Sequence, residues 1–232
     1  MLKSYNNIEI AWNRLKEYLG DTFDSTLTDF PTCCAFSTNE VARYGDRFYQ
    51  ESYTYLYELT HFHFSPYKER FFHVIVNFMD FHSLSQLGDF GCGIGLDAQA
   101  LMQYGYEVEL FDFESSSSEY LRWRLRRDLK REVKIRDIYN TPLQQRYDLV
   151  YAVDVLEHAI NPFLLIRRLF AAGDYVCINL FPHETRKHVP IDLHFPLNHW
   201  KLLPAMCELG TLLQVENSGD TVVTLWKTIE NN

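Results

Sequence analysis

The order of apolar and polar residues divides the chain near residue 82. Before this point, apolar and aromatic residues recur at helical spacing in three segments, residues 12–19, 53–57 and 71–79. Residues 21–40 are rich in Pro, Thr, Ser and Asp and predict a loop. We therefore expect a helical N-terminal cap over residues 1–81 and a second domain over residues 82–232.

After residue 82, short apolar runs alternate with helical patterns. The expected strands are residues 84–90, 108–112, 133–136, 148–153 and 175–181, followed by an antiparallel pair at 212–215 and 222–226. The expected helices are residues 97–104, 116–130, a helix that begins at Asn161-Pro162 and ends before Gly173, and residues 197–209. Strands that alternate with helices predict an α/β fold with a doubly wound, mostly parallel sheet.

Charge and cysteine content narrow the possible functions. The formal net charge of -9 opposes phosphate-backbone binding as the main activity, because such binding depends on Lys and Arg. The five cysteines are odd in number and include no CxxC pair, which opposes a disulfide framework or a zinc knuckle. The N-terminal residues contain no signal-peptide pattern, and no apolar run has the length of a membrane span. We expect a cytoplasmic protein without nucleic-acid or membrane partners.

A glycine-rich turn carries the strongest chemical signal. Gly91, Gly93 and Gly95 stand where the strand 84–90 turns into a helix. Glycine lets the backbone adopt positive φ and approach a ligand, and the helix that follows directs its N-terminus at the bound group. A nicotinamide-binding turn would need its third glycine at the position of Leu96, so the spacing opposes that class of enzyme.

Three aspartates stand at three successive strand ends near this turn. Asp89 can offset the positive charge of a ligand, and it would repel a pyrophosphate but not a zwitterionic amino acid. Asp112 can accept hydrogen bonds from both hydroxyls of a ribose, although Glu114 is a rival for that role. Asp137 can accept a hydrogen bond from an adenine amino group, with Ile138 against the ring. Each aspartate has the alternative reading of a turn residue.

Two segments resemble a known family. LGDFGCGIGLDAQALMQYGYEVELFDFE, residues 87–114, resembles the opening motifs of class I S-adenosylmethionine-dependent methyltransferases. VYAVDVLEH, residues 150–158, resembles the D-V-L-E-H motif of the branch with the ubiquinone-biosynthesis O-methyltransferases. The resemblance covers about residues 82–210. It implies a Rossmann-like, seven-stranded sheet whose last strand is antiparallel.

The resemblance also implies S-adenosylmethionine as the cofactor. The residues it assigns to cofactor binding are Asp89, Gly91, Cys92, Gly93, Gly95, Asp112, Phe113, Asp137, Ile138, Asp154 and Val155. The glycine turn would contact the methionine end, Asp112 the ribose and Asp137 the adenine. The chain departs from the pattern at Phe113 and Glu114, and at residues 171–174, where a Pro-Gly-Gly type of turn is usual.

His158 is the first candidate for a catalytic base. It stands four residues after Asp154 at the end of the fourth expected strand. A base is needed only if the methyl acceptor must lose a proton, and imidazole titrates near neutrality. Asp154, Glu157 and His158 also offer suitable ligands for a divalent ion. Capping of the turn is the favoured reading of Glu157 and His158, so no metal site is predicted.

A second group of histidines follows the fifth expected strand. His183, His188 and His194 fall within a few residues, and His199 comes shortly after. Related methyltransferases carry a histidine before the helix that precedes the last strand pair, and His194 fits that place best. His183 and His194 join His158 as candidate bases. The spacing of these histidines matches no zinc signature.

The cap offers candidates for an acceptor pocket. These are Tyr53, Tyr57, His61, His63 and Tyr67, for which packing against the second domain is the alternative. The expected function is methyl transfer to a hydroxyl or amine of a small molecule, by a monomer or a homodimer. A peptide- or protein-modifying methyltransferase and a catalytically idle cofactor-binding regulator remain alternatives.

Overall fold

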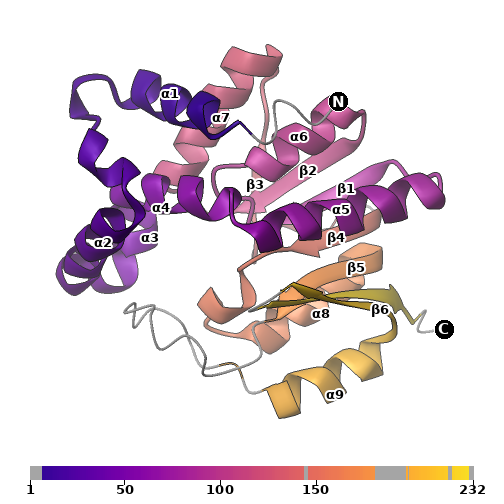
Figure 1. Ribbon diagram of the computed structural model, residues 1–232. Coiled ribbons are helices and arrows are strands. Elements are labelled where there is room, and N and C mark those ends of the chain that lie inside the picture. Colours follow the sequence, from indigo (N-terminus) through magenta and orange to yellow (C-terminus); the bar gives the residue numbers. More distant parts are fainter. Residues whose placement is uncertain (1–6, 144–145, 181–196, 198, 219–220, 230–232) are drawn as a thin grey trace.

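In the computed structural model, seven strands form a central sheet that is flanked by helices, and the N-terminal helices gather at one end of it (Figure 1). The structure describes residues 7–143, 146–180, 197, 199–218 and 221–229. No described helix is both long and apolar enough to cross a membrane.

The sheet has the strand order β3-β2-β1-β4-β5-β7-β6. Its strands are β1 (Gln86–Phe90), β2 (Glu107–Asp112), β3 (Ile135–Asp137), β4 (Tyr147–Ala152), β5 (Gly173–Leu180), β6 (Gly210–Ser218) and β7 (Thr221–Thr228). The first five run parallel, and β7 is antiparallel to both of its neighbours. The predicted fold class is confirmed. The chain reverses its direction of strand addition between β1 and β4, and ligands bind at such a switch point.

Helices cover both faces of the sheet. They are α1 (Ile8–Leu19), α2 (Phe30–Tyr44), α3 (Phe48–Glu51), α4 (Thr54–His63), α5 (Pro66–Phe81), α6 (Leu96–Tyr104), α7 (Ser116–Leu129), α8 (Pro162–Ala172) and α9 (His199–Leu209). Short 3-10 helices are η1 (Gly20–Thr22), η2 (Ser25–Thr28), η3 (Gly45–Arg47) and η4 (Leu156–His158). Buried side chains of α5, α6 and α7 share one core with the sheet, and those of α8 and α9 share the core on the other face.

A third apolar cluster joins the N-terminal helices to the glycine turn. Leu15 of α1 and Leu56 of α4 pack with Ile94 of the turn and Tyr120 of α7. Helix α5 differs from α1–α4, because its buried face belongs to the core of the sheet. The helices α1–α4 are called the cap below. A division of the chain at residue 82 stays a prediction.

The prediction of a loop over residues 21–40 is wrong. Helix α2 occupies residues 30–44, and η1 and η2 precede it. The side chain of Asp29 caps α2 by accepting a hydrogen bond from the Thr32 N–H at 3.1 Å, and Pro31 stands in the first turn. Asp before a helix and Pro within its first turn are helix-start signals, so the polar composition of this segment was misleading.

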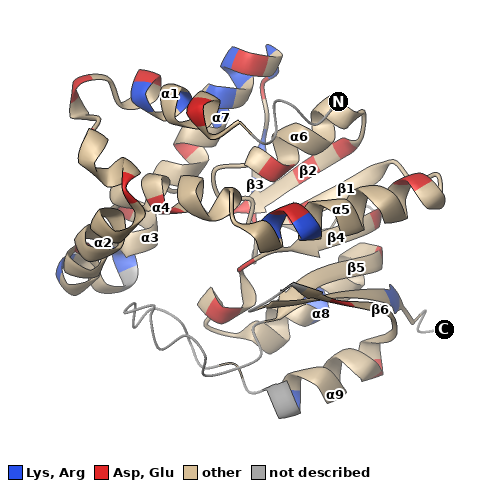
Figure 2. Cartoon of the chain, viewed as in Figure 1, with Lys and Arg blue, Asp and Glu red and all other residues tan. Residues whose placement is uncertain are grey.

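Basic residues are frequent in α7 and occur in α1, and acidic residues lie among them (Figure 2). Arg14 pairs with Asp128 at 2.8 Å, and Arg127 pairs with Glu17 at 2.7 Å. Arg124 is buried and donates to the carbonyl oxygen of Ile94 at 2.6 Å. This buried guanidinium therefore fixes the glycine turn against α7.

Candidate active site

A cavity lies at the carboxyl ends of β1, β2 and β4, where the cap meets the sheet. Ten of the eleven residues predicted to bind a cofactor line it: Asp89, Gly91, Cys92, Gly93, Gly95, Asp112, Phe113, Ile138, Asp154 and Val155. Parallel strands bring their carboxyl ends to one edge of a sheet, which is why residues far apart in the chain meet here.

The glycine turn is held in a conformation that other residues resist. Gly91 has φ +80°, and a Cβ at this position would lie 2.4 Å from Cγ2 of Val155. Gly95 has φ +62°, and a Cβ there would lie 2.2 Å from Cδ1 of Leu121. Gly91 is thus required by the floor of the cavity, whereas Gly95 is required by the packing of α7 against the turn.

Asp112 is fixed by two backbone groups at the end of β2. Its Oδ2 accepts a hydrogen bond from the Gly93 N–H at 2.7 Å, and its Oδ1 accepts one from the Phe113 N–H at 2.8 Å. Burial raises the pKa of Asp112 to about 6, although these hydrogen bonds lower it. The rival, Glu114, is exposed, pairs with Arg122 at 2.5 Å and is not among the cavity-lining residues.

Asp137 does not line the cavity. Its Oδ1 accepts hydrogen bonds from the N–H groups of Tyr139 and Asn140 at 2.8 and 2.7 Å, and its Oδ2 accepts one from the Asn140 side chain. The carboxylate is therefore engaged by the turn after β3, which was the alternative reading of this residue. Ile138 and Tyr139 line the cavity in its place.

A charged group beside the glycine turn includes a lysine that sequence reasoning missed. Lys68, in the first turn of α5, lies 3.3 Å from Asp97, which also lies 3.5 Å from Nδ1 of His63. Burial lowers the pKa of Lys68, but Asp97, Asp154 and Asp89 outweigh this and raise it. Burial, together with Asp97, raises the pKa of Asp89 well above its usual value.

His158 meets a tyrosine from the cap. It ends η4 and lines the cavity, and its Nδ1 lies 2.7 Å from the hydroxyl of Tyr49. The two rings meet edge to face, with centroids 5.0 Å apart. Tyr49 comes from α3, more than a hundred residues earlier in the chain, and no motif spacing could have paired it with His158.

Asp154 is held in place from three sides. Its φ is +56°, and its backbone N–H donates to the side chain of Asn179 at 2.8 Å. Its Oδ1 accepts from the Asn179 amide at 2.6 Å, and its Oδ2 accepts from the Tyr67 hydroxyl at 2.7 Å. Asp154 thus links β4, β5 and α5 at the edge of the cavity.

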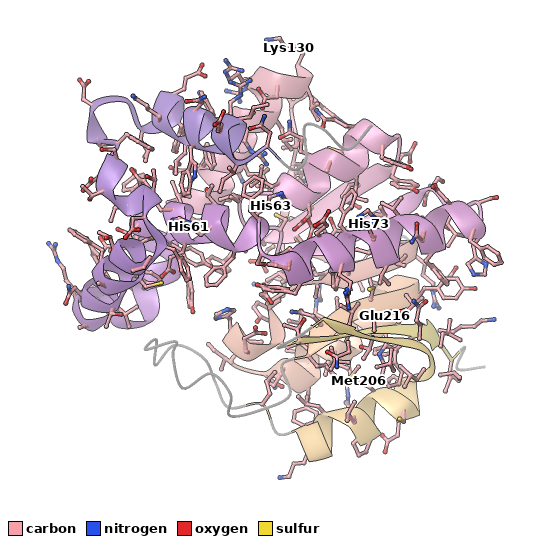
Figure 3. The ribbon with its side chains drawn as sticks, viewed as in Figure 1. His61, His63, His73, Lys130, Met206 and Glu216 are labelled. Carbon is pink, nitrogen blue, oxygen red and sulfur yellow. The ribbon has the colours of Figure 1, made fainter. Side chains whose placement is uncertain are left out.

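The five cap candidates separate into two groups. His63 and Tyr67 line the cavity. Tyr53 is exposed, Tyr57 is buried and accepts a hydrogen bond from the Asp24 N–H, and His61 lies 3.1 Å from the Leu27 carbonyl oxygen. In Figure 3, His61 lies among the cap helices, whereas His63 lies where the cap meets α5 and α6.

The cavity-facing side of α4 carries residues that sequence reasoning missed, Tyr55 and Glu58. Apolar spacing identifies the opposite side, on which Leu56 and Tyr57 pack into the cap. Glu58 is 2% exposed, and no described group hydrogen-bonds its Oε1. Burial raises the pKa of Glu58 to about 7, Ser37 lowers it and Glu40 raises it.

The candidate bases His183 and His194, and also His188, lie outside the described residues. The side chain of His199, the first residue of α9, is likewise not described. Among the residues that the structure describes, no group of three or more His, Cys, Asp and Glu side chains is arranged to hold a metal ion.

Comparisons with known proteins bear on the fold and on the central part of the chain. Residues 86–179 match the family model of a methyltransferase domain. The magnesium protoporphyrin IX methyltransferase of Synechocystis PCC 6803, solved with bound SAM, has a TM-score of 0.60 at 13% identity, over 94% of this chain and 97% of that one. TehB from Haemophilus influenzae has a TM-score of 0.52 at 17% identity, over 68% and 62%. No curated protein matches the chain in sequence.

The matched domain, the strand order and the glycine turn define the class I methyltransferase fold. Residues 86–179 are therefore similar to a methyltransferase domain, and the chain has the fold of the class I S-adenosylmethionine-dependent methyltransferases. The particular branch with the D-V-L-E-H motif stays a prediction.

The buried carboxyl of Glu58 predicts a pH-dependent cost in stability. Its pKa is raised from 4.5 to about 7. The cost in stability is therefore absent at a pH below the pKa of the unfolded chain and complete at a pH above the pKa of the folded protein. We expect the unfolding free energy of Glu58→Gln, relative to wild type, to increase by roughly 2–3 kcal/mol between about pH 5 and about pH 8.5. Urea denaturation at both pH values measures this difference.

Glu51→Gln is the matched control, because Glu51 is exposed on α3 and pairs with Arg47. Its effect on stability should be the same at both pH values. An effect of Glu58→Gln that does not change with pH would contradict the burial of a titrating carboxyl at this position.

Proposed function

We propose that the protein transfers the methyl group of S-adenosylmethionine to a hydroxyl or an amine of a small molecule bound between the cap and the glycine turn. One observation carries the proposal: ten of the eleven residues predicted to bind the cofactor line the same cavity as the Tyr49–His158 pair. A peptide- or protein-modifying enzyme would need an open groove. Here α3, α4 and α5 contribute residues to the wall of the cavity, which favours a small acceptor.

The residues present suit S-adenosylmethionine. Gly91 and Gly93 line the cavity with positive φ, a conformation in which the backbone of the turn can approach the methionine end. The Asp112 carboxylate is oriented to accept hydrogen bonds from the ribose hydroxyls, and Ile138 suits the face of the adenine. Lys68 offers an ammonium group for the cofactor's carboxylate. We assign no adenine contact to Asp137, because its oxygens are used by the turn.

The chemistry asks mainly for alignment. S-adenosylmethionine supplies a methyl group that is already activated by the positive sulfur, and the acceptor attacks it from the side opposite the sulfur. The cavity contributes the relative placement of the two molecules and the exclusion of water. In the tautomer in which Nδ1–H of His158 donates to the Tyr49 oxygen, Nε2 has the lone pair that takes a proton from the acceptor. Tyr49 is then a positioning residue.

A protein that binds the cofactor without catalysing methyl transfer is the second candidate. Nothing among the described residues of the cavity favours it. Three positions of the glycine turn, Gly91, Gly93 and Gly95, carry no side chain. The base candidate has a hydrogen-bond partner that fixes its ring. Such an arrangement is costly to keep without turnover, because it places several titratable groups in a buried space.

Replacement of Asp112 tests the ribose assignment. Charge-assisted hydrogen bonds are worth about 1.5–3 kcal/mol each, so Asp112→Ala should weaken S-adenosylhomocysteine binding by about tenfold or more. Glu114→Gln is the control, because Glu114 pairs with Arg122 outside the cavity. Isothermal titration calorimetry measures both. Equal affinity of Asp112→Ala and wild type, or a loss confined to Glu114→Gln, would remove Asp112 from the site.

Replacement of His158 tests the base. We expect His158→Gln to lower turnover by about 100-fold or more, the usual contribution of a general base, while S-adenosylhomocysteine affinity stays unchanged. His73→Gln, which alters a half-exposed histidine on α5 outside the cavity, should keep full activity. Turnover is measured as transfer of labelled methyl groups to metabolite extracts. Full activity of His158→Gln would show that His158 is not the base.

A further inference from the structure

We propose that the methyl acceptor is an amine, which enters as an ammonium ion and is held by Glu58 beneath the tyrosine rings of the cap. This inference rests on the proposed function and narrows it from a hydroxyl or amine to a basic nitrogen. Its starting point is the charge of the described cavity wall, in which carboxyl groups far outnumber cations.

The described wall holds six carboxyl side chains, Glu58, Asp89, Asp97, Asp112, Asp154 and Glu157. Lys68 is the single Lys or Arg among the same described lining residues, and it lies 3.3 Å from Asp97. An acceptor with a carboxylate or phosphate would therefore meet repulsion from this part of the wall. A positively charged acceptor would be attracted by it.

The carboxyl groups are not equivalent. Asp89, Asp97 and Asp112 lie around the glycine turn, where the cofactor is assigned. Asp154 already accepts from Tyr67 and Asn179. Glu157 belongs to η4, next to His158. Glu58 comes from α4 in the cap and is 2% exposed. Ser37 hydrogen-bonds its carboxyl group and Glu40 lies near it, but no described group hydrogen-bonds its Oε1.

A buried carboxyl with an unpaired oxygen lowers stability unless a partner arrives. An ammonium group bound beside Glu58 would supply both the missing donors and the opposite charge. A neutral hydroxyl would supply one donor and no charge, and a carboxylate would add repulsion. Glu58 thus favours an ammonium group over a hydroxyl group, and a hydroxyl group over a carboxylate.

The surrounding rings suit the same ligand. Tyr49 and Tyr55 line the cavity with ring centroids 4.9 Å apart, and aromatic faces attract ammonium groups. Burial, followed by Tyr49, Glu58, Asp112 and Asp154, raises the pKa of Tyr55 well above its usual value. Tyr55 therefore lies near carboxyl groups of both the cap and the sheet.

The reaction balances with the groups present. His158 takes one proton from the ammonium ion, and the amine nitrogen recovers its lone pair. That lone pair forms the new N–C bond as the C–S bond of the sulfonium breaks, and the electron pair of the broken bond stays on sulfur. The products are an N-methylammonium ion, a neutral thioether and a protonated His158, so the total charge is unchanged.

Three fragments with one ring and different charges test the inference. Benzylamine, benzyl alcohol and benzoate are titrated by NMR into the protein saturated with S-adenosylhomocysteine. We expect benzylamine to bind at least about tenfold more tightly than benzyl alcohol, as one charge-assisted contact provides, and benzoate not to bind. Equal or tighter binding of the alcohol or the acid, or binding of none of the three, overturns the inference.

A comparison of Glu58→Gln with Glu51→Gln separates a direct contact between Glu58 and the ligand from the effect of the overall charge of the protein. Both replace a carboxyl group by an amide of similar shape, but Glu51 is exposed on α3 and pairs with Arg47. Benzylamine affinity should fall by about tenfold in Glu58→Gln only. S-adenosylhomocysteine affinity should be unchanged in both variants, which shows that the site is intact. Unchanged benzylamine affinity in Glu58→Gln overturns the role of Glu58.

The labelled atom gives the final decision. Labelled methyl groups are transferred to metabolite extracts, and mass spectrometry identifies the methylated atom of each product. A label on nitrogen supports the inference, and a label on oxygen, carbon or sulfur overturns it. Failure of the proposed function looks different, because the protein would then bind no S-adenosylhomocysteine, or would bind it and label nothing.

Discussion

Two backbone hydrogen bonds to Asp112 connect the parts on which the active site depends. Gly93 in the glycine turn and Phe113 at the end of β2 each donate to one oxygen of this carboxylate. Because the strand order reverses beside β1, the turn and the carboxylate lie at the same crevice. Arg124 holds the other side of the turn through the Ile94 carbonyl oxygen. These contacts hold the glycine turn against β2 and α7.

The cap completes the site with chemistry of a different kind. It contributes Tyr49, Tyr55 and Glu58, whereas the sheet contributes the glycine turn and Asp112. The contact between Tyr49 and His158 joins the cap to the end of β4, and both residues line the cavity. Glu58 lowers the stability of the fold when it is ionised. Packing gives no reason for a buried acid at this position, whereas the proposed binding of an ammonium ion does.

The sheet, and the part of the cavity lining that comes from the glycine turn and the strand ends, were largely predictable, whereas the lining that comes from the cap was not. These predictions rest on local patterns that each favour one structure: the alternation of strands and helices, the spacing of the glycines and the position of Asp112 at a strand end. The cap lacks such patterns: Asp29 and Pro31 resemble loop residues but begin α2, and apolar spacing on α4 identifies Tyr57 rather than Tyr55. Asp137 shows a further limit, since an acid at a strand end can serve its own turn. The Tyr49–His158 contact needs the folded chain.

A crystal structure of the protein with S-adenosylhomocysteine tests the central claim most directly. We expect both ribose hydroxyls within hydrogen-bond distance of the Asp112 carboxylate, the amino-acid end against Gly91 and Gly93, and the sulfur facing the side with Tyr49 and His158. A ribose held by Glu114, or S-adenosylhomocysteine bound outside this cavity, would contradict the account.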